Sequence, residues 1–410
     1  MRRSHKTKRV LIIVQNMPVP LDRRVWQECQ ALKDAGFAVS VVCPRGSGQD
    51  ARQVIDGVEI FTYAPPPPTK GVRSYLVEFC YCWIRTLIIS FRIQVRQGID
   101  IIQACNPPDT YFALALLHRP FGTRFIFDQH DLCPEVYLSR FGENRLWLLR
   151  GVRLLERLTY RSADHVIVTN ESYRATALER GGLPGDMVTV VRSGPDPQRM
   201  FREASHPELR DGRRFLCCWL GIMGPQDGVD LLLRSIATFV NDLGREDVHF
   251  VLLGYGDCLD DLRALSTDLG IDAWVTFTGK VGPKEISAYL STSDIGLSAD
   301  PLSPLNDVST MNKTMEYMAF ELPVVAYNLR ETRISAGRAA VYVEPNDAFA
   351  YAKAISDLLD SPTQRAEMGS EGRARVENVL AWQRQVPGYV DAFRRVIGQV
   401  AKVRTSELVM

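Results

Sequence analysis

The sequence predicts an α/β protein with two Rossmann-like domains, each built on a doubly wound parallel sheet. Three observations support this prediction. The chain has 410 residues, which is more than a single hydrophobic core usually holds. Short, β-rich apolar runs alternate with helical patterns, as in βαβ units. The alternation stops at a polar, proline-bearing stretch, residues 194–213, and then begins again.

The linker sets the predicted domain boundaries. Residues 1–200 form an N-terminal domain, residues 201–385 form a C-terminal domain, and residues 386–410 form a helix that packs back on the first domain. Ligands of such folds bind outside the carboxyl ends of the strands, so two facing sheets would define one central cleft. The predicted strands are residues 10–15, 38–43, 58–63, 101–104, 124–128, 165–169 and 187–191 in the first domain, and 215–220, 249–253, 275–278, 295–298, 324–326 and 340–343 in the second.

The composition of the chain indicates which kinds of binding partner and which cellular compartment suit it. The formal net charge is +1, but residues 1–200 carry 27 Lys and Arg against 19 Asp and Glu, and residues 201–410 carry 22 against 29. The first half therefore suits an anionic partner, either nucleic acid or a membrane. No zinc-finger, helix-turn-helix or stacking-aromatic pattern favours nucleic acid. The nine cysteines have neither metal-ligand nor disulfide spacing, which indicates a reducing compartment.

Two predicted helices of the first domain have the composition of a membrane interface. The helix from Leu76 to Arg96 is rich in aliphatic and aromatic residues, and its basic residues, Arg85 and Arg92 among them, fall on one narrow stripe. These charges argue against a spanning helix, whereas a broad apolar face with a basic stripe suits a helix lying in the interface. The helix from Asn144 to Arg161 repeats the pattern. The alternative for both is a helix packed on the sheet with its arginines in water.

The best candidate for chemistry in the second domain is a loop, a helix and a buried strand at residues 306–326. The helix is predicted from Thr310 to Phe320, and methionines form its apolar face. Its free N–H groups and the Lys313 ammonium would bind a phosphate, and Glu316 would accept hydrogen bonds from sugar hydroxyls. The alternative is an ordinary solvated face. The polar face consists of the N-cap Ser309 with Asn312, Lys313 and Glu316.

Polar loops follow three predicted strands of the first domain, at the edge where ligands bind. The motif DRR opens the helix after the first strand, and two prolines stiffen the loop CNPPDT. The loop DQHDLCPE offers the imidazole of His130 beside a carboxylate, as a general acid/base or hydroxyl-orienting group. The residues predicted to contact the acceptor in these loops are Asp22, Arg23, Arg24, Asn106, Asp109 and Asp131.

Two glycine-bearing turns follow strands of the second domain, at the expected phosphate or sugar position. The turn LGIMGPQDG contains Gly221 and Gly224, and LGYGD contains Gly254. Neither has the third glycine of the dinucleotide fingerprint, and the loop after the first strand has no glycine, so NAD chemistry is disfavoured. Walker A, metal-ligand and nucleophile-elbow patterns are absent as well.

These segments together resemble the family 4 retaining glycosyltransferases, which have the GT-B fold and move a sugar from a nucleotide diphosphate to an acceptor. The similarity extends over almost the whole chain. EYMA followed by LPVVA matches the family's E-A-M-A-x-G-x-P-V-V-A block, in which the Glu, here Glu316, binds the nucleotide ribose. DRRVW, NPPDT, FDQHDLCPE and NDVSTMNKTMEYMA resemble one bacterial branch that builds surface polysaccharides.

The chain departs from this family in the acids of its donor site. The family spaces two acids seven residues apart, and the first contacts the donor sugar. Val308 stands at the matching position, so Asp307 or Asn306 would substitute from beside it. Glu321 stands where the block usually has glycine.

The basic clamp of the diphosphate is missing too. Ile222 and Asp227 stand roughly where the family has an Arg and a Lys, so Lys313 would replace the clamp from the helix. The resemblance implies that Lys313 and the helix N-terminus stabilise the departing diphosphate without a metal. His130 would contact the donor sugar or orient the acceptor hydroxyl, and Asp307 would complete the catalytic group.

The function expected from this resemblance is metal-independent transfer of a hexosyl or N-acetylhexosaminyl group. The co-substrate would be a nucleotide sugar, expected to be a UDP-sugar, and no cofactor is expected. A lipid-linked or glycan acceptor and a cytoplasmic enzyme, peripheral on the inner face of the membrane, would fit the two basic helices. Two alternatives remain open. One is a nucleotide-sugar epimerase of GT-B architecture, and the other is a catalytically silent nucleotide-sugar-binding scaffold, which the missing acid and clamp keep open.

Overall fold

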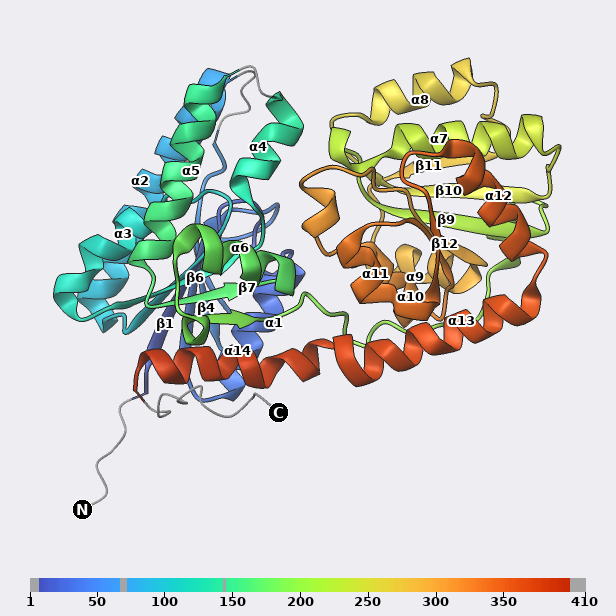
Figure 1. Ribbon diagram of the computed structural model, residues 1–410. Helices are drawn as coiled ribbons and strands as arrows, with labels where there is room; N and C mark the ends of the chain where they lie inside the picture. The colour runs from blue at the N-terminus through green and yellow to red at the C-terminus, as the bar shows by residue number, and fades with distance from the viewer. Residues whose placement is uncertain (1–6, 67–71, 143–144, 399–410) are drawn as a thin grey trace, which may run out of the picture. The chain divides into compact units, whose positions relative to one another are not determined.

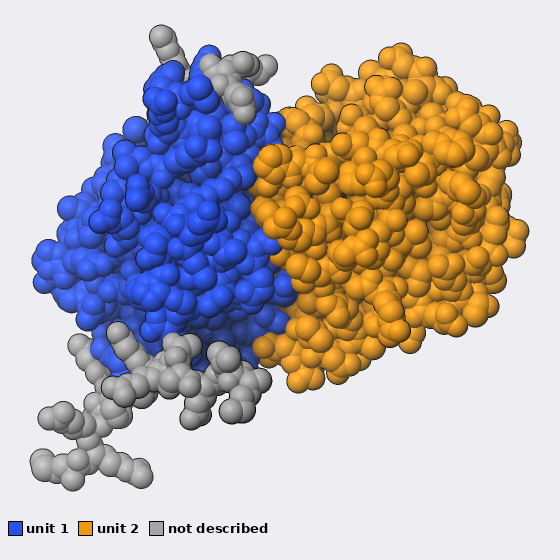
Figure 2. Space-filling model, viewed as in Figure 1, with its two compact units in different colours: residues 1–192, 385–410 blue, residues 193–384 orange. Residues whose placement is uncertain are grey.

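The computed structural model describes residues 7–66, 72–142 and 145–398, and only the backbone of residues 72–76. The chain forms two compact units, residues 1–192 with 385–410 and residues 193–384, which are coloured separately in Figure 2. The linker after residue 192 belongs to unit 2, because Arg373 donates to the carbonyl oxygens of Pro197 (3.0 Å) and Met200 (2.8 Å). The boundary therefore precedes the predicted one at residue 200.

Unit 1 contains an eight-stranded sheet in the order β3-β4-β2-β1-β5-β6-β7-β8 (Figure 1). Neighbouring strands run parallel, apart from the antiparallel pair β3 and β4. The order reverses between β1 and β5, which is the topological switch point where ligands of such sheets bind. The strands are β1 (Arg9–Ile13), β2 (Ala38–Pro44), β3 (Arg52–Ile55), β4 (Val58–Tyr63), β5 (Ile101–Cys105), β6 (Arg124–Gln129), β7 (His165–Val168) and β8 (Val188–Val190).

The helices of unit 1 connect these parallel strands. The last helix, α14, crosses the unit boundary at Gln385, and its Tyr389 hydroxyl donates to Oε1 of Gln103 in β5 (2.6 Å), which ties it to the sheet of unit 1. Residues 399–410 of the predicted C-terminal segment lie outside the described residues. The helices are α1 (Arg23–Asp34), α2 (Val72–Gln97), α3 (Tyr111–His118), α4 (Cys133–Phe141), α5 (Leu146–Ser162), α6 (Glu171–Gly181) and α14 (Trp382–Val396), with short turns at Arg119–Phe121 and Gly185–Met187.

Unit 2 contains a six-stranded parallel sheet in the order β11-β10-β9-β12-β13-β14. Its switch point lies between β9 and β12. The strands are β9 (Phe215–Ile222), β10 (Val248–Tyr255), β11 (Val275–Gly279), β12 (Ile295–Ser298), β13 (Val324–Tyr327) and β14 (Ala340–Val343). The helices are α7 (Val229–Ala237), α8 (Leu259–Asp268), α9 (Pro283–Thr292), α10 (Asn312–Ala319), α11 (Arg330–Ala336), α12 (Ala348–Leu359) and α13 (Pro362–Arg375). Short 3₁₀ or π turns lie at Pro207–Arg210, Pro225–Asp227, Thr238–Asp242, Asn306–Val308, Gly337–Ala339 and Val376–Leu380.

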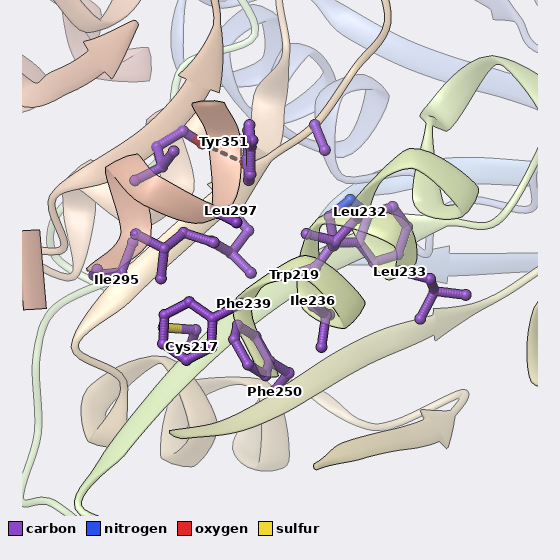
Figure 3. Packing of buried hydrophobic residues seen from close by; sticks show 14 of the residues in the cluster. Cys217, Trp219, Leu232, Leu233, Ile236, Phe239, Phe250, Ile295, Leu297 and Tyr351 are labelled. Carbon is purple, nitrogen blue, oxygen red and sulfur yellow. Dashed lines mark hydrogen bonds between the residues drawn. The ribbon is translucent and has the colours of Figure 1, made fainter. Parts of the chain in front are cut away.

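The sheet of unit 2 is buried on both faces, as continuous apolar strands predict. Successive residues of β9 point into different cores: Cys217 and Trp219 pack with the cluster shown in Figure 3, and Cys218 packs with the cluster on the other face. This alternation explains why the adjacent Cys217 and Cys218 do not form a pair. All nine cysteines are free thiols.

The predicted strands all appear in the structure, with small changes at their ends. The sequence analysis missed β3, a four-residue edge strand in which exposed and half-buried residues alternate, because so short a strand has too little apolar surface to stand out. The predicted N-cap at Ser309 is wrong. The helix begins at Asn312, and the Ser309 hydroxyl instead donates to the carbonyl of Leu305 (2.8 Å), closing the preceding 3₁₀ turn.

Candidate functional site

Each unit gathers polar side chains at the switch point of its sheet. In unit 1 these side chains come from the loops after β1, β5 and β6 and from the start of α1. In unit 2 they come from the loops after β9 and β12 and from the start of α10. Because the carboxyl ends of parallel strands meet at one edge, residues that are far apart in the sequence become neighbours there.

Arg24 is the centre of the unit 1 site. Asp22 caps α1 by accepting from the N–H of Val25 (3.1 Å), which sets the helix start and turns Arg24 inward. The guanidinium lies 3.1 Å from Oδ1 of Asp128 and 2.9 Å from Oε1 of Glu28, and only 9% of its side chain is exposed. The prediction that Arg24 contacts an acceptor is therefore not supported by its position, because its charge is neutralised inside the protein. The neighbouring Arg23 is exposed.

His130 extends this network toward the surface. Its Nε2 atom lies 2.9 Å from Oδ2 of Asp128 and 3.1 Å from Nε of Arg24. The two contacts compete, because Nε2 accepts from Arg24 when it is unprotonated and donates to Asp128 when it carries the proton. His130 is partly exposed, so its ring connects the surface to the buried carboxylate of Asp128.

The two buried acids of this network have opposite pKa shifts. Burial and the charge of Asp128 raise the pKa of Glu28 well above its usual range, although Arg24 opposes this effect. Burial would also raise the pKa of Asp128, but His130 and Arg24 outweigh it and hold that pKa well below its usual range. Asp128 is thus the favoured ionised partner of Arg24, and the environment favours the protonated form of Glu28 beside it.

The residues Glu28, Cys105, Asp128 and His130 bring four metal-ligating atoms within 4.8 Å of one another. They suit a metal poorly, because the Arg24 guanidinium already supplies positive charge to this group. Burial and the charge of Asp128 also raise the pKa of the Cys105 thiol well above its usual range, whereas a metal-bound cysteine is a thiolate. Metal-independent chemistry remains a prediction.

Asn106 fixes the loop that carries His130. It is buried, and its Oδ1 accepts from the N–H groups of His130 (2.6 Å) and Asp131 (3.1 Å). Its Nδ2 donates to Oδ1 of Asp109 (2.9 Å) and to the carbonyl of Asp131 (2.7 Å). Burial raises the pKa of Asp109 to about 6 and also raises the pKa of Asp131. Asn106 and Asp109, predicted to contact the acceptor, instead satisfy the polar groups of an irregular turn.

Lys313 occupies the corresponding position in unit 2. Its Nζ atom lies 2.6 Å from Oδ1 of Asp300 and 4.0 Å from Oδ1 of Asp227, and 4.9 Å from the centre of the Trp219 ring. The lysine side chain is 10% exposed and that of Asp300 is 3% exposed. The ammonium that was predicted to stabilise a diphosphate is therefore already paired with a carboxylate, and both groups are largely excluded from solvent.

The loop before α10 is held by its own polar residues. Asn306 is buried and donates to the carbonyls of Gln226 (2.9 Å) and Pro301 (2.9 Å), which joins the loops after β9 and β12. Asp307 accepts from the N–H of Arg330 (2.9 Å) at the start of α11. Both residues have structural partners, so their predicted contact with the donor stays a prediction.

Two glycines of the donor turns, Gly221 and Gly254, are required by packing. Gly254 pairs with Gly221 across β10 and β9, and a Cβ atom on Gly254 would lie 2.0 Å from the carbonyl oxygen of Gly221. A Cβ atom on Gly221 would lie 3.0 Å from the Trp219 ring. Gly224 donates its N–H to Oδ2 of Asp227 (3.1 Å). These contacts explain Gly221 and Gly254 without a bound phosphate, whereas a Cβ atom on Gly224 would meet side-chain atoms of Gln226 and Asp227, which can move.

Helix α10 is buried on nearly all sides, so the alternative of a solvated polar face is wrong. Every residue from Thr314 to Ala319 is buried, and Glu316 is 8% exposed. Tyr317 anchors the helix, because its hydroxyl accepts from the N–H of Leu220 (2.8 Å) and donates to the carbonyl of Leu297 (3.1 Å). Asn312 is the exposed residue at its start.

Sequence reasoning missed three residues of these networks. Gln103 donates to Glu28 (2.8 Å) and to Asp128 (2.8 Å), and a glutamine inside the buried strand IIQAC was a usable signal. Glu28 follows Arg24 by one helical turn, which is a common ion-pair spacing. Asp300 is the second residue after β12, so the rule applied to the other strand ends would have found it.

Comparison with known proteins identifies both domains. Residues 21–194 match the model described as "Glycosyl transferase 4-like domain", and residues 214–361 match "Glycosyl transferases group 1". Each of the two domains therefore matches a glycosyltransferase domain model. The two matches exclude nearly all of the linker and all of α13 and α14, and they include every candidate residue named above.

Relatives of this chain include mannosyltransferases. A GDP-mannose-dependent alpha-(1-6)-phosphatidylinositol monomannoside mannosyltransferase of Mycolicibacterium smegmatis is 29% identical over 193 residues, which are 45% of this chain and 49% of that protein. A protein of the same description from Mycobacterium tuberculosis is 26% identical over 270 residues, which are 63% of this chain and 69% of that protein. The chain thus spans about half the length of the first relative.

Solved structures confirm the GT-B fold of this chain. Sucrose-phosphate synthase from Thermosynechococcus elongatus has a TM-score of 0.78 at 17% identity, over 96% of this chain and 100% of that chain. The Anabaena protein Alr3699/HepE in complex with UDP-glucose has a TM-score of 0.71 at 16% identity, over 94% of this chain and 99% of that chain. At these identities the likeness concerns the fold alone.

Proposed function

We propose that this chain is a retaining glycosyltransferase that moves a sugar from a nucleotide-diphosphate sugar to a lipid-linked acceptor. The observation that carries the proposal is the position of α10. This helix begins at the switch point of a glycosyltransferase group 1 domain, where Lys313 contacts the loops after β9 and β12, and it bears Glu316 of the matched sequence block. A nucleotide sugar bound there would place its diphosphate at the helix N-terminus and its ribose near Glu316.

The leaving diphosphate needs positive charge, and Lys313 supplies a basic side chain at this point. In the structure its ammonium is shared by Asp300 and Asp227. We infer that the ammonium moves from Asp300 toward the diphosphate as negative charge develops on it, while the α10 N-terminus contributes its N–H groups. Attack on the same face of the sugar from which the diphosphate departs would retain the anomeric configuration. We propose that this step needs no metal.

His130 is the acid/base or orienting group of unit 1 in this proposal. Its Nε2 contacts link its proton to the Asp128 and Arg24 pair, and Asn106 holds its backbone. A hydroxyl of donor or acceptor that bonds to His130 would therefore meet an imidazole whose orientation is set by buried groups.

The donor is proposed from two sets of relatives. The mycobacterial relatives are described as GDP-mannose-dependent, and the Anabaena structure contains UDP-glucose. We therefore propose a GDP- or UDP-hexose, and the relatives add GDP-mannose to the UDP-sugar expected from the sequence. The acylated phosphatidylinositol acceptors in the relatives' names favour a lipid-linked acceptor.

The surface of unit 1 supports a peripheral membrane association. Helices α2 and α5 expose large apolar side chains, of which Val95 (83% exposed) and Trp147 (70%) are examples, between exposed arginines such as Arg92 and Arg153. No helix among the described residues is long and apolar enough to cross a membrane. An interfacial position of α2 and α5 matches this combination of apolar and basic residues. Asn144 of the predicted second helix lies outside the described residues.

Incubation of the purified protein with radiolabelled GDP-mannose or UDP-sugars and bacterial membranes tests the proposal. Label that moves into the lipid extract identifies a transferase. An interconverted nucleotide sugar identifies an epimerase instead. The Glu316→Ala variant is the control, and it should lose the label transfer.

Binding without turnover is the second candidate function. It is favoured by one observation, the pairing of Lys313 with Asp300 and the presence of Asp227 where a basic clamp is expected. In that case nucleotide sugars would bind in calorimetry, and no product would form with any membrane fraction.

A further inference from the structure

An arginine-lined cavity of about 420 Å³ lies at the outer edge of the unit 1 sheet, between α2 and the β3–β4 pair. Strand β2 and strand β4 separate this edge from the switch point at β1 and β5. The cavity is therefore distinct from the Arg24 and His130 network. Five arginines line it: Arg45, Arg52, Arg85, Arg92 and Arg96. We call it the α2–β4 pocket.

The charge of the α2–β4 pocket is poorly compensated by the protein. Arg52 pairs with Glu59 (3.0 Å), and Arg45 donates to the neutral hydroxyl of Thr62 (3.1 Å). Arg85, Arg92 and Arg96 are exposed, and no acid or hydrogen-bond acceptor among the described residues contacts them. Five guanidinium groups around one concave space repel one another, so an anion bound among them would be strongly favoured.

The geometry of these arginines suits a phosphate group. Arg85, Arg92 and Arg96 are separated by seven and four residues, which places them on one face of α2. Guanidinium forks bind phosphate oxygens in pairs, and several forks can surround one phosphate. The floor of the pocket is apolar and includes Phe61, Ile89 and Ile93, which would take the carbon skeleton attached to such a group.

The next face of α2 points to a lipid as the source of that phosphate. Val77, Ile84, Ile88 and Val95 are exposed, and their spacing places them on a single stripe beside the arginine stripe. An exposed apolar stripe, a row of arginines and a pocket thus follow one another around the helix. An interfacial position of α2 would place the apolar stripe among the acyl chains, and the arginine row with its pocket at the level of the lipid phosphates.

We propose that the α2–β4 pocket binds the phosphate group of an anionic membrane lipid, with phosphomonoester headgroups preferred because they leave more phosphate oxygens free for the arginines. The proposal rests on the membrane association of unit 1 proposed above and gives it a specific lipid site. A diffuse basic surface would respond to surface charge alone, whereas a pocket distinguishes headgroups of equal charge.

Vesicle co-sedimentation tests this preference. Phosphatidylcholine vesicles that contain phosphatidic acid or phosphatidylserine are matched in surface charge, and the ratio of the two affinities is measured. We expect the wild-type protein to bind phosphatidic acid vesicles about tenfold more tightly, which corresponds to about 1.4 kcal/mol. The Arg85→Gln/Arg92→Gln variant should reduce this ratio to about one.

The matched control is Arg153→Gln/Arg157→Gln, which removes the same charge from exposed positions on α5 outside the pocket. This control should weaken binding to both vesicles and keep the ratio. A wild-type ratio of one, or equal loss of the ratio in both variants, would overturn the proposal. Thermal unfolding checks that both variants are folded.

Soluble phosphates distinguish the source of the ligand. Glycerol 3-phosphate should bind the pocket weakly and leave the vesicle preference unchanged at equal phosphate concentration. If it abolishes the preference, the pocket takes soluble phosphate compounds and the lipid assignment is wrong. No nucleotide sugar is present in these assays, so their failure would leave the glycosyltransferase proposal untouched, and failure of label transfer would leave the vesicle ratio valid.

Discussion

The ammonium of Lys313 lies 2.6 Å from a carboxylate oxygen of Asp300, and both side chains are almost fully enclosed at the switch point of unit 2. Ser298 donates a further hydrogen bond to Asp300 (2.7 Å), and Thr314 donates to Ser298 (3.2 Å). A residue expected to be a free cation for a diphosphate is thus the centre of a satisfied polar network. This relationship makes the two roles of Lys313, in stability and in turnover, separable by experiment.

Replacing Lys313 with methionine should destabilise unit 2. The change leaves the Asp300 carboxylate buried without a counter-charge, for which about 3–5 kcal/mol of unfolding free energy is typical. Adding Asp300→Asn should recover most of this loss, because the buried charge is then gone. Urea unfolding of the two variants measures both effects. If the Lys313→Met variant alone were as stable as the wild type, the ion pair between Lys313 and Asp300 would not be formed in solution.

Glu316→Gln should weaken donor binding and leave the fold intact. The change keeps the size of a buried side chain and removes its negative charge, so a ribose hydroxyl would lose a charge-assisted acceptor. We expect about a tenfold rise in KM or Kd for the nucleotide sugar, with a smaller change in kcat. Glu321→Gln is the control, since Glu321 is exposed and two residues beyond α10. An unchanged donor affinity in Glu316→Gln would remove this residue from the site.

Glu321→Gly should stabilise the protein. Glu321 has a φ of 58°, in the left-handed region that costs a residue with a Cβ atom about 1 kcal/mol. This backbone explains why the related sequence block usually has glycine there. We expect a gain of about 0.5–1 kcal/mol in unfolding free energy and no change in donor affinity. Thermal and urea unfolding would show the gain, and a loss of stability would mean that the Glu321 side chain makes a stabilising contact.

Glu156 should make the stability of unit 1 depend on pH. This residue of α5 is 2% exposed, and burial raises its pKa from 4.5 to about 7, with Arg180 opposing and Asp109 and Glu135 adding to the rise. A raised folded-state pKa gives stability that is complete below pH 4.5 and lost as the pH rises through 7. The shift corresponds to about 3 kcal/mol.

The variant Glu156→Gln removes this titration. Wild type and variant should have similar unfolding free energies near pH 4.5, and the variant should be the more stable one above pH 7. Glu179→Gln on the exposed side of α6 serves as the control and should follow the wild-type curve. Parallel pH profiles of Glu156→Gln and wild type would contradict the prediction.

Much of the fold follows from local pattern. The strands at residues 58–63, 295–298 and 340–343 have the predicted bounds, because a buried strand of a parallel sheet must be apolar throughout and its neighbours must turn. The start of α10 could not be predicted in this way. Ser309 has a side chain of the kind that often caps a helix, but its hydroxyl closes the turn before the helix instead. Which of the two hydrogen bonds forms depends on the path of the backbone between β12 and α10, and that path is set by the tertiary structure.

The sequence by itself determined the two-domain α/β architecture, the order of the strands along the chain and the strand ends at which polar residues gather, because hydrophobic periodicity and turn residues are local properties. Only the tertiary structure decided which of those polar side chains are exposed to a ligand and which are paired inside the protein. Arg24 and Lys313 have the same charge as Arg23 and Arg92 in the sequence, yet the first two are enclosed with carboxylates and the others are exposed. Asp128 lies 104 residues from Arg24 along the chain, and Asp300 lies 13 residues before Lys313, in the loop after β12. The effect of each carboxylate on the charge depends on separation in space and on burial, which no local pattern contains.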